Sequence, residues 1–119
     1  MRNDHLSIPS ELGSIRIASS AVADVVARTA ARSYGVVGLS SRTRVGRLLG
    51  RERAASAVTL AEEDGKLRID LHVVVEYGLN LAEVASSVSN RVAYEVERLT
   101  GLPVRAVEVH VDDVRTGGK

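Results

Sequence analysis

The stretch 66–77 constrains the fold of this chain most, because its residues alternate between apolar and polar types. The positions of one parity carry Leu67, Ile69, Leu71, Val73, Val75 and Tyr77. The positions of the other parity carry Arg68, Asp70, His72 and Glu76, with Val74 as their one apolar member. This period of two predicts a β-strand with one face in the core and the other in water. Other elements must therefore cover one face of this strand.

A long amphipathic helix is expected directly after this strand, over residues 81–99, and signals mark both of its ends. Asn80 is placed to cap the first turn, with Glu83 three residues later in a capping-box arrangement. Gly101 is placed just beyond the last turn, and Pro103 prevents the helix from continuing. The expected buried stripe consists of Leu81, Val84, Ala85, Val88, Val92, Val96 and Leu99.

A second helix is expected over residues 21–33, where apolar residues again recur at helical spacing. Ser19 and Ser20 precede it as candidate N-caps, and Gly35 follows it as a helix stop. The side chains expected to be buried are Val22, Val25, Val26, Thr29 and Ala30. The spacing therefore predicts a helix that packs one face against the rest of the domain.

Shorter strands are expected at 13–18, 36–39, 58–61 and 107–111. Asp64-Gly65 is a hairpin signal that joins the third of these to the central strand. The apolar parity breaks at Arg105-Ala106, which predicts a bulge or a late start of the last strand. The order strand, helix, hairpin, helix, strand predicts an α+β fold of the split β-α-β type, with two helices on one face of a small sheet.

The length of 119 residues fits a single domain, which we expect over residues 13–115, between a flexible leader at 1–12 and a flexible tail at 116–119. The formal net charge is +1, so no field of the whole molecule attracts nucleic acid or anionic lipid. The chain has no cysteine and opens with no apolar signal-peptide region, which favours a cytoplasmic protein. Its longest aliphatic run is too short to span a bilayer.

His72 and His110 are the candidates for metal or acid–base chemistry, because both lie on polar strand parities close to acidic residues. If their strands were neighbours, imidazoles and carboxylates would meet as they do in metal sites. A solvated sheet face with alternating charges explains the same pattern, and we favour it. No serine, histidine and acid form a recognisable catalytic motif. We therefore predict no enzymatic activity, no metal and no cofactor.

The one strongly basic stretch is the loop 40–56, which separates the two patterned halves of the chain. Its candidate partner-binding residues are Arg42, Arg44, Arg47, Leu48, Leu49, Arg51 and Arg53. A basic amphipathic segment can lie on anionic lipid, bind an acidic partner or hold nucleic-acid phosphates. A plain linker, or a turn whose two leucines plug the domain, is the alternative.

Several blocks of the chain resemble the alkaline shock protein family of Gram-positive bacteria. The blocks are IDLHVVVEYG at 69–78, TGLPV at 100–104 and VEVHV at 107–111, with GSIRIA at 13–18 and YGVVGL at 34–39 as further matches. The resemblance covers nearly everything from residue 13 to residue 114. It implies a non-enzymatic cytoplasmic protein of the cell envelope stress response, which self-associates and is held at the membrane by a partner. It supplies no catalytic residues.

From the residues and the resemblance together we expect a stress-response scaffold or adaptor. It would form a homo-oligomer and act near the envelope through a membrane-anchoring partner protein, with no membrane span of its own. The alternative is a nucleic-acid or regulatory binding module that uses residues 42–53, although nucleic acid is the less favoured partner of a nearly neutral chain.

Overall fold

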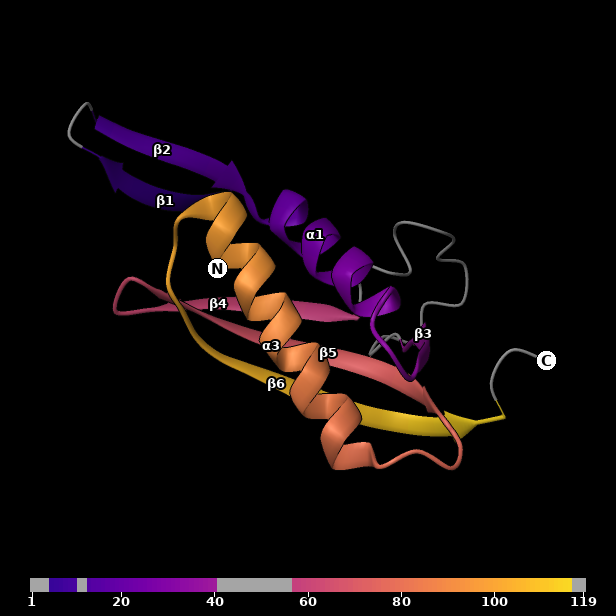
Figure 1. The fold of residues 1–119 in the computed structure, drawn as a ribbon. Coiled ribbons are helices and arrows are strands. Elements are labelled where there is room, and N and C mark those ends of the chain that lie inside the picture. Colours follow the sequence, from indigo (N-terminus) through magenta and orange to yellow (C-terminus); the bar gives the residue numbers. More distant parts are fainter. Residues whose placement is uncertain (1–4, 11–12, 41–56, 117–119) are drawn as a thin grey trace.

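The elements follow one another in the order that the sequence predicts, with one additional strand at the beginning (Figure 1). In a computed structural model of the chain, the described residues are 5–10, 13–40 and 57–116, and for residues 5–16 the description covers the backbone alone. The elements are β1 (His5–Ser10), β2 (Gly13–Ala18), α1 (Ser19–Ala31), β3 (Val36–Leu39), β4 (Val58–Glu63), β5 (Lys66–Glu76), α3 (Leu81–Thr100) and β6 (Val104–Arg115). This is an α+β fold, as predicted.

Strand β5 lies in the middle of a mixed sheet. On one side it pairs with β4 and β3, both antiparallel, and on the other side it pairs with β6, which runs parallel to it. The main chain of β5 divides its hydrogen bonds by parity. The even-numbered His72 and Glu76 donate to the carbonyls of Ala57 and Gly35, whereas the odd-numbered Leu67 and Tyr77 donate to those of Pro103 and Arg115. The strand is thus satisfied along both edges.

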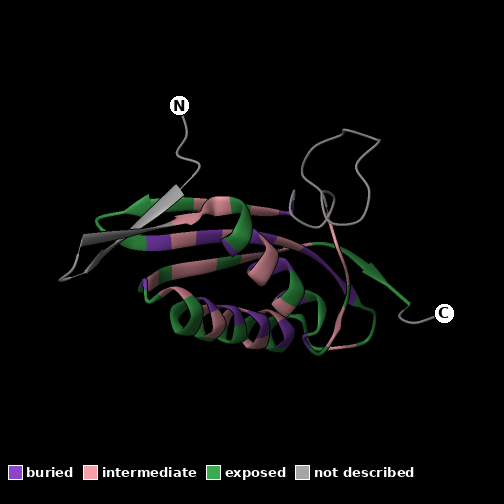
Figure 2. Cartoon of the chain, turned by 90° about the horizontal axis from the view of Figure 1, so that it is seen from above, coloured by how far each residue is buried: buried purple, intermediate pink, exposed green. Residues whose placement is uncertain are grey.

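The core lies between the odd-numbered face of β5 and the two helices, which cover that face together (Figures 1 and 2). The side chains of Leu67, Ile69, Leu71, Val73 and Val75 are fully buried, as the alternation predicts. They meet Val84, Val88, Val92 and Val96 of α3 and Val22, Val26 and Ala30 of α1. Full burial of one such side chain contributes about 1.5–3 kcal/mol, so this single face supplies a large share of the apolar stabilisation.

Several predicted core positions lie at the margins instead. Leu81 and Leu99, at the two ends of α3, are 42% and 52% exposed, and Tyr77 is 76% exposed in the turn after β5. The periodicity continues to these residues, but the opposing layer ends before them. In α1 the buried stripe is rotated about the helix axis relative to the prediction. Ala23 and Ala27 are buried, in place of Val25 and Thr29.

The beginning of the chain differs from the prediction. Residues 5–10, expected to belong to a flexible leader, form β1 and pair antiparallel with β2 from His5 opposite Ala18 to Ser10 opposite Gly13. Pro9 has no backbone N–H, but each strand of a two-stranded sheet has one edge that its partner does not use, where such a residue is tolerated. Helix α1 also begins earlier than predicted, with Ala18 at the N-cap position and Ser19 and Ser20 inside the first turn.

The ends of α3 are as predicted. The Asn80 side chain accepts a hydrogen bond of 3.0 Å from the Glu83 backbone N–H. Gly101 has a φ of 79°, in the left-handed region, and its N–H donates to the Glu97 carbonyl at 2.9 Å. The predicted irregularity in the last strand is present too. Val104 and Ala106 pair with consecutive residues of β5, which leaves Arg105 as the extra residue of a bulge.

Three glycine-to-alanine substitutions are expected to lower the free energy of unfolding by increasing amounts, least at Gly38, more at Gly101 and most at Gly35. Gly38 has neither a positive φ nor a neighbour near its added Cβ, so it is the matched control. Gly101 has the positive φ but open space, and its substitution should cost about 1 kcal/mol. Gly35 has a φ of 87°, and its Cβ would lie 2.8 Å from Val84 Cγ2, which adds about 1–3 kcal/mol. Urea unfolding of the three variants measures these costs. Equal stability of all three would contradict the backbone conformations of Gly35 and Gly101.

Candidate functional site

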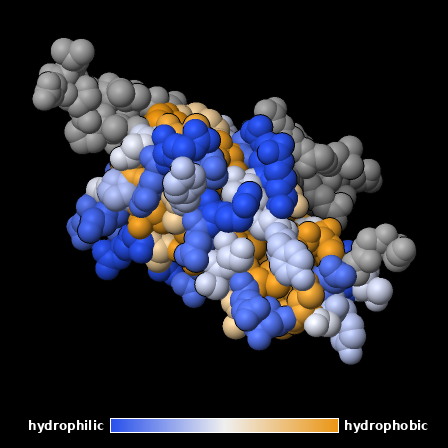
Figure 3. All heavy atoms as spheres, in the orientation of Figure 1, coloured by the Kyte–Doolittle hydropathy of each residue, from blue (hydrophilic) through white to orange (hydrophobic). Residues whose placement is uncertain are grey.

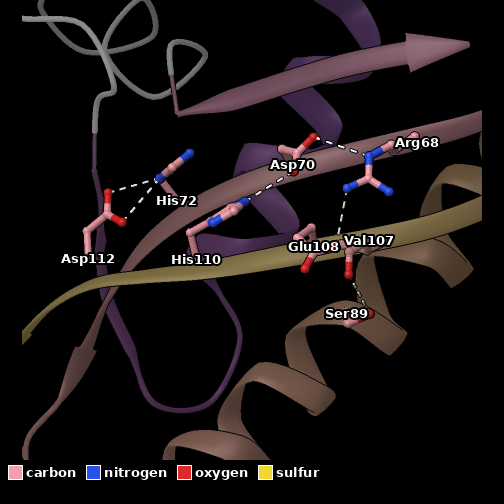
Figure 4. A network of polar contacts seen from close by, with 8 residues as sticks. All are labelled: Arg68, Asp70, His72, Ser89, Val107, Glu108, His110 and Asp112. Carbon is pink, nitrogen blue, oxygen red and sulfur yellow. Dashed lines mark hydrogen bonds and ion pairs between the residues drawn. The ribbon is translucent and has the colours of Figure 1, made fainter.

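The even-numbered face of β5, away from the helices, carries the most extensive group of interacting polar side chains in the described residues (Figure 4). The parallel register places His72 of β5 directly opposite His110 of β6. Their imidazole rings stack with centroids 4.4 Å apart and an angle of 11° between the planes. The two histidines that the sequence singled out are therefore brought together.

Each imidazole has its own carboxylate. His72 Nδ1 lies 3.0 and 3.2 Å from the two carboxylate oxygens of Asp112, and His110 Nε2 lies 3.1 Å from Asp70 Oδ1. Asp112 reaches His72 because of a second bulge in β6, where Val111 and Asp113 pair with consecutive residues of β5. The extra residue of a bulge has no partner in the ladder, and its side chain takes a new direction. The bulge thus positions this carboxylate.

Arg68 continues the row at its other end. Its guanidinium lies 3.7 Å from Asp70 and 3.4 Å from Glu108. We call the six residues Arg68, Asp70, His72, Glu108, His110 and Asp112 the polar ladder. Most of its side chains are between one quarter and one half exposed, and His72, at 12%, is the most buried. Partly exposed ion pairs of this kind contribute about 0–1 kcal/mol each.

The polar ladder is a poor metal site, although its two strands are neighbours. Ring nitrogens bind a metal through lone pairs in the ring plane, and stacked rings direct those lone pairs along parallel planes rather than toward one point. Among the described residues, no group of three or more histidine, cysteine or acidic side chains is placed to hold a metal ion. The geometry therefore favours the alternative of a solvated face with alternating charges.

A carboxylate-oriented imidazole is also part of a catalytic triad, in which it acts as an acid and a base. A triad needs a hydroxyl or thiol nucleophile against the imidazole. The hydroxyls of Ser33, Ser89 and Thr100 donate instead to main-chain carbonyls of Thr29, Val107 and Val96. The imidazole hydrogen bonds in the described part of the chain run to Asp112 and Asp70. These three hydroxyls are therefore directed to the main chain and not to the imidazoles of the polar ladder.

The predicted partner-binding residues, from Arg42 to Arg53, lie outside the described residues, so their role stays a prediction. The structure adds an exposed apolar patch that the sequence analysis did not identify. Tyr34, Tyr77 and Leu81 are 72%, 76% and 42% exposed close to the point where β5 leads into α3. Figure 3 shows hydrophobic residues (orange) interspersed with hydrophilic ones (blue) on the face turned to the viewer. A hollow of about 240 Å³ beside it is lined by Tyr34, Leu79, Asn80, Glu83, Val84 and Ser87.

Comparison of the sequence with known protein families identifies the family of this chain. Residues 7–116 match the model of the alkaline shock protein 23 family, which is described as having a cell envelope-related function. The chain belongs to this family. The resemblance that the sequence blocks indicated is thereby confirmed.

Two relatives of this alkaline shock protein family member match over almost their whole lengths. The uncharacterized protein YloU of Bacillus subtilis is 30% identical over 92% of this chain and 95% of its own. The uncharacterized protein Spy1614 of Streptococcus pyogenes is 28% identical over 96% of this chain and 98% of its own. No solved structure matches the chain. In the described residues, no helix combines the length and the apolar character needed to cross a bilayer.

The stacking of His72 and His110 is expected to be measurable as a coupling energy. Each histidine would be replaced by alanine, singly and together, and the four proteins unfolded with urea. Directly opposed cross-strand pairs contribute about 0.2–1 kcal/mol beyond their separate effects. A double-mutant cycle that closes with no coupling would show that the two rings do not interact in solution.

Proposed function

We propose that this protein is a non-enzymatic scaffold or adaptor of the cell envelope stress response, which self-associates and is held near the membrane by a partner protein. The observation that carries the proposal is the family match over residues 7–116, because the described function of that family is related to the envelope. The family match alone does not distinguish an enzyme from a scaffold. The choice of a scaffold over an enzyme is supported by the side chains on the described surface.

The polar ladder supports a scaffold because its reactive side chains are already engaged with one another. Both imidazoles are held by carboxylates of the same sheet, and Arg68 is shared between two acidic residues. The exposed apolar patch around Tyr34, Tyr77 and Leu81 supports binding of other proteins, since protein interfaces are enriched in exposed tyrosine and depleted of charge at their centres.

Sedimentation across a concentration series, followed by co-purification from native membranes, tests this proposal. A scaffold of this kind should gain mass as concentration rises and should be recovered in part with the membrane fraction. It should leave that fraction when its partner is removed. A strict monomer that stays wholly in the supernatant would contradict both parts of the proposal.

A nucleic-acid or regulatory binding module is the second candidate, favoured by the five arginines between residues 42 and 53. Salt separates the two functions. Phosphate contacts release counterions, so binding of generic RNA or DNA would weaken about 10³- to 10⁵-fold between 50 and 200 mM salt if six to ten contacts form. Tight, salt-steep binding would give the second candidate priority.

Replacement of Arg44, Arg47 and Arg51 by serine is expected to leave the melting temperature nearly unchanged and to reduce attachment to the partner or membrane. Surface substitutions usually cost no more than about 0.5 kcal/mol each, whereas loss of three charges removes most of the concentrated basic patch. The matched control replaces the exposed Arg28, Arg32 and Arg91, which changes the net charge equally. Attachment equal to that of the parent would identify residues 42–53 as a linker.

Replacement of Leu48 and Leu49 by serine distinguishes a binding segment from a plug of the domain. If these leucines face a partner, stability should hold and attachment should fall. If they fill the domain, the urea midpoint should fall with them, because buried apolar volume is lost.

A further inference from the structure

Among the described residues, the outer edge of β6 is the longest unpaired strand edge of the four-stranded sheet. β6 has 12 residues and pairs with β5 alone in the described part of the chain, whereas the opposite margin is divided between the shorter β3 and β4. Figure 1 shows β6 at the margin of the sheet, with no other labelled element beyond it. An edge of this kind carries a row of N–H and C=O groups that another strand can use.

The register identifies the groups that point outward. Because the odd-numbered residues of β5 bond to β6, the even-numbered Glu108 and His110 supply the matching groups of β6. Backbone groups alternate along a strand, so those of Val107, Val109 and Val111 face away from β5. The Val107 carbonyl accepts from the Ser89 hydroxyl of α3 at 3.4 Å, which agrees with this direction.

Two bulges limit the part of the edge that can pair. One lies at Arg105 and the other at Asp112, and a bulge interrupts a ladder and bends its strand. Between them, residues 107–111 form a regular stretch, in which the backbone groups of three valines face outward while their side chains pack against the core. The bulges thus prevent open-ended pairing along the strand and leave a segment that fits one partner strand of about five residues.

We infer that this segment is an interface for a second copy of the chain. The two β6 strands pair antiparallel about a two-fold axis at Val109 and join the two sheets into one. This inference rests on the proposed self-association and names its surface. In this register Val109 faces the partner's Val109, Val107 faces the partner's Val111, and Glu108 faces the partner's His110.

The charges of β6 select this register. A slip of two residues in one direction would place Glu108 opposite the partner's Glu108, and a slip in the other would place it opposite the partner's Asp112. Both slips oppose like charges, which destabilises a cross-strand pair. The two-fold register opposes a carboxylate and an imidazole instead, and it does so twice. Glu108 and His110 contact Arg68 and Asp70 of their own chain, but they are 54% and 41% exposed, which leaves part of each side chain for a partner.

The helix beside this edge carries small residues on the side that would face the second copy. Ser89 of α3 contacts β6, and the small residues Ala82, Ser86 and Ala93, three, four or seven positions from it, share that side of the helix. The two copies of α3 would lie on the same face of the joined sheet, beside the new strand pair, where small side chains allow helices to approach closely. Ser86 is exposed in the single chain.

Disulfide trapping tests the interface, because the chain has no cysteine of its own. The variants Glu108→Cys and His110→Cys would be oxidised separately and as a mixture. Opposed positions of this type have Cα atoms about 4.5 Å apart, within reach of a disulfide. The mixture should form covalent dimer about tenfold faster than either variant alone. Thr59→Cys, exposed on the opposite margin of the sheet, mixed with His110→Cys gives the collision rate.

The outcomes separate the interface from self-association itself. Faster trapping by one variant alone would overturn the register, and trapping no faster than the Thr59 control in a self-associating protein would overturn the β6 interface. A parent protein that stays monomeric at every concentration would overturn self-association as well.

As an independent check, Ser86→Arg should weaken association about tenfold or more with unchanged far-UV circular dichroism. Tyr94→Arg, on the other flank of α3, should leave association unchanged. Equal effects of the two would contradict the inference.

Discussion

The one-sided burial of β5 is the constraint on which the rest of the structure depends. Its odd-numbered side chains are completely buried beneath α1 and α3, whereas Arg68, Asp70 and His72, at even-numbered positions, belong to the polar ladder. The same parity directs the main chain, because odd residues bond β6 and even residues bond β3 and β4. A slip of one residue would exchange both the faces and the bonding partners, so this strand fixes the register of the whole sheet.

Local signals in the sequence were sufficient for the elements of the second half. Asn80 and Gly101 act through contacts a few residues away, and the alternation of β5 records its own burial. The bulge at Arg105 was visible for the same reason, since a break in parity is a local event. The first half was less well predicted. Strand β1 was not predicted, because it contains Pro9 and its formation depends on pairing with β2. The apolar stripe of a helix also does not show where the layer packed against it ends, so Leu81 and Leu99 were wrongly expected to be buried.

The polar ladder shows where local reasoning ends. The sequence identified His72 and His110 and the acidic residues around them, but it did not determine that their strands are parallel neighbours. The stacking and the separate carboxylates depend on a pairing between residues about 40 positions apart and on a bulge that redirects Asp112. The exposed patch around Tyr34 and Tyr77 was not predicted, because tyrosine occurs both in protein cores and at surfaces. The role of residues 42–53 stays a prediction.

Hydrogen exchange measured residue by residue along β6 tests the account most directly, because one strand reports on both of its edges. The amides of Glu108 and His110 bond β5 and should exchange slowly at every protein concentration. The amides of Val109 and Val111 should exchange rapidly in dilute solution and become protected as concentration rises. Fast exchange of Val109 and Val111 at all concentrations would contradict the paired edge. Fast exchange of Glu108 and His110 would contradict the register of β5 and β6 from which the fold, the ladder and the interface are all argued.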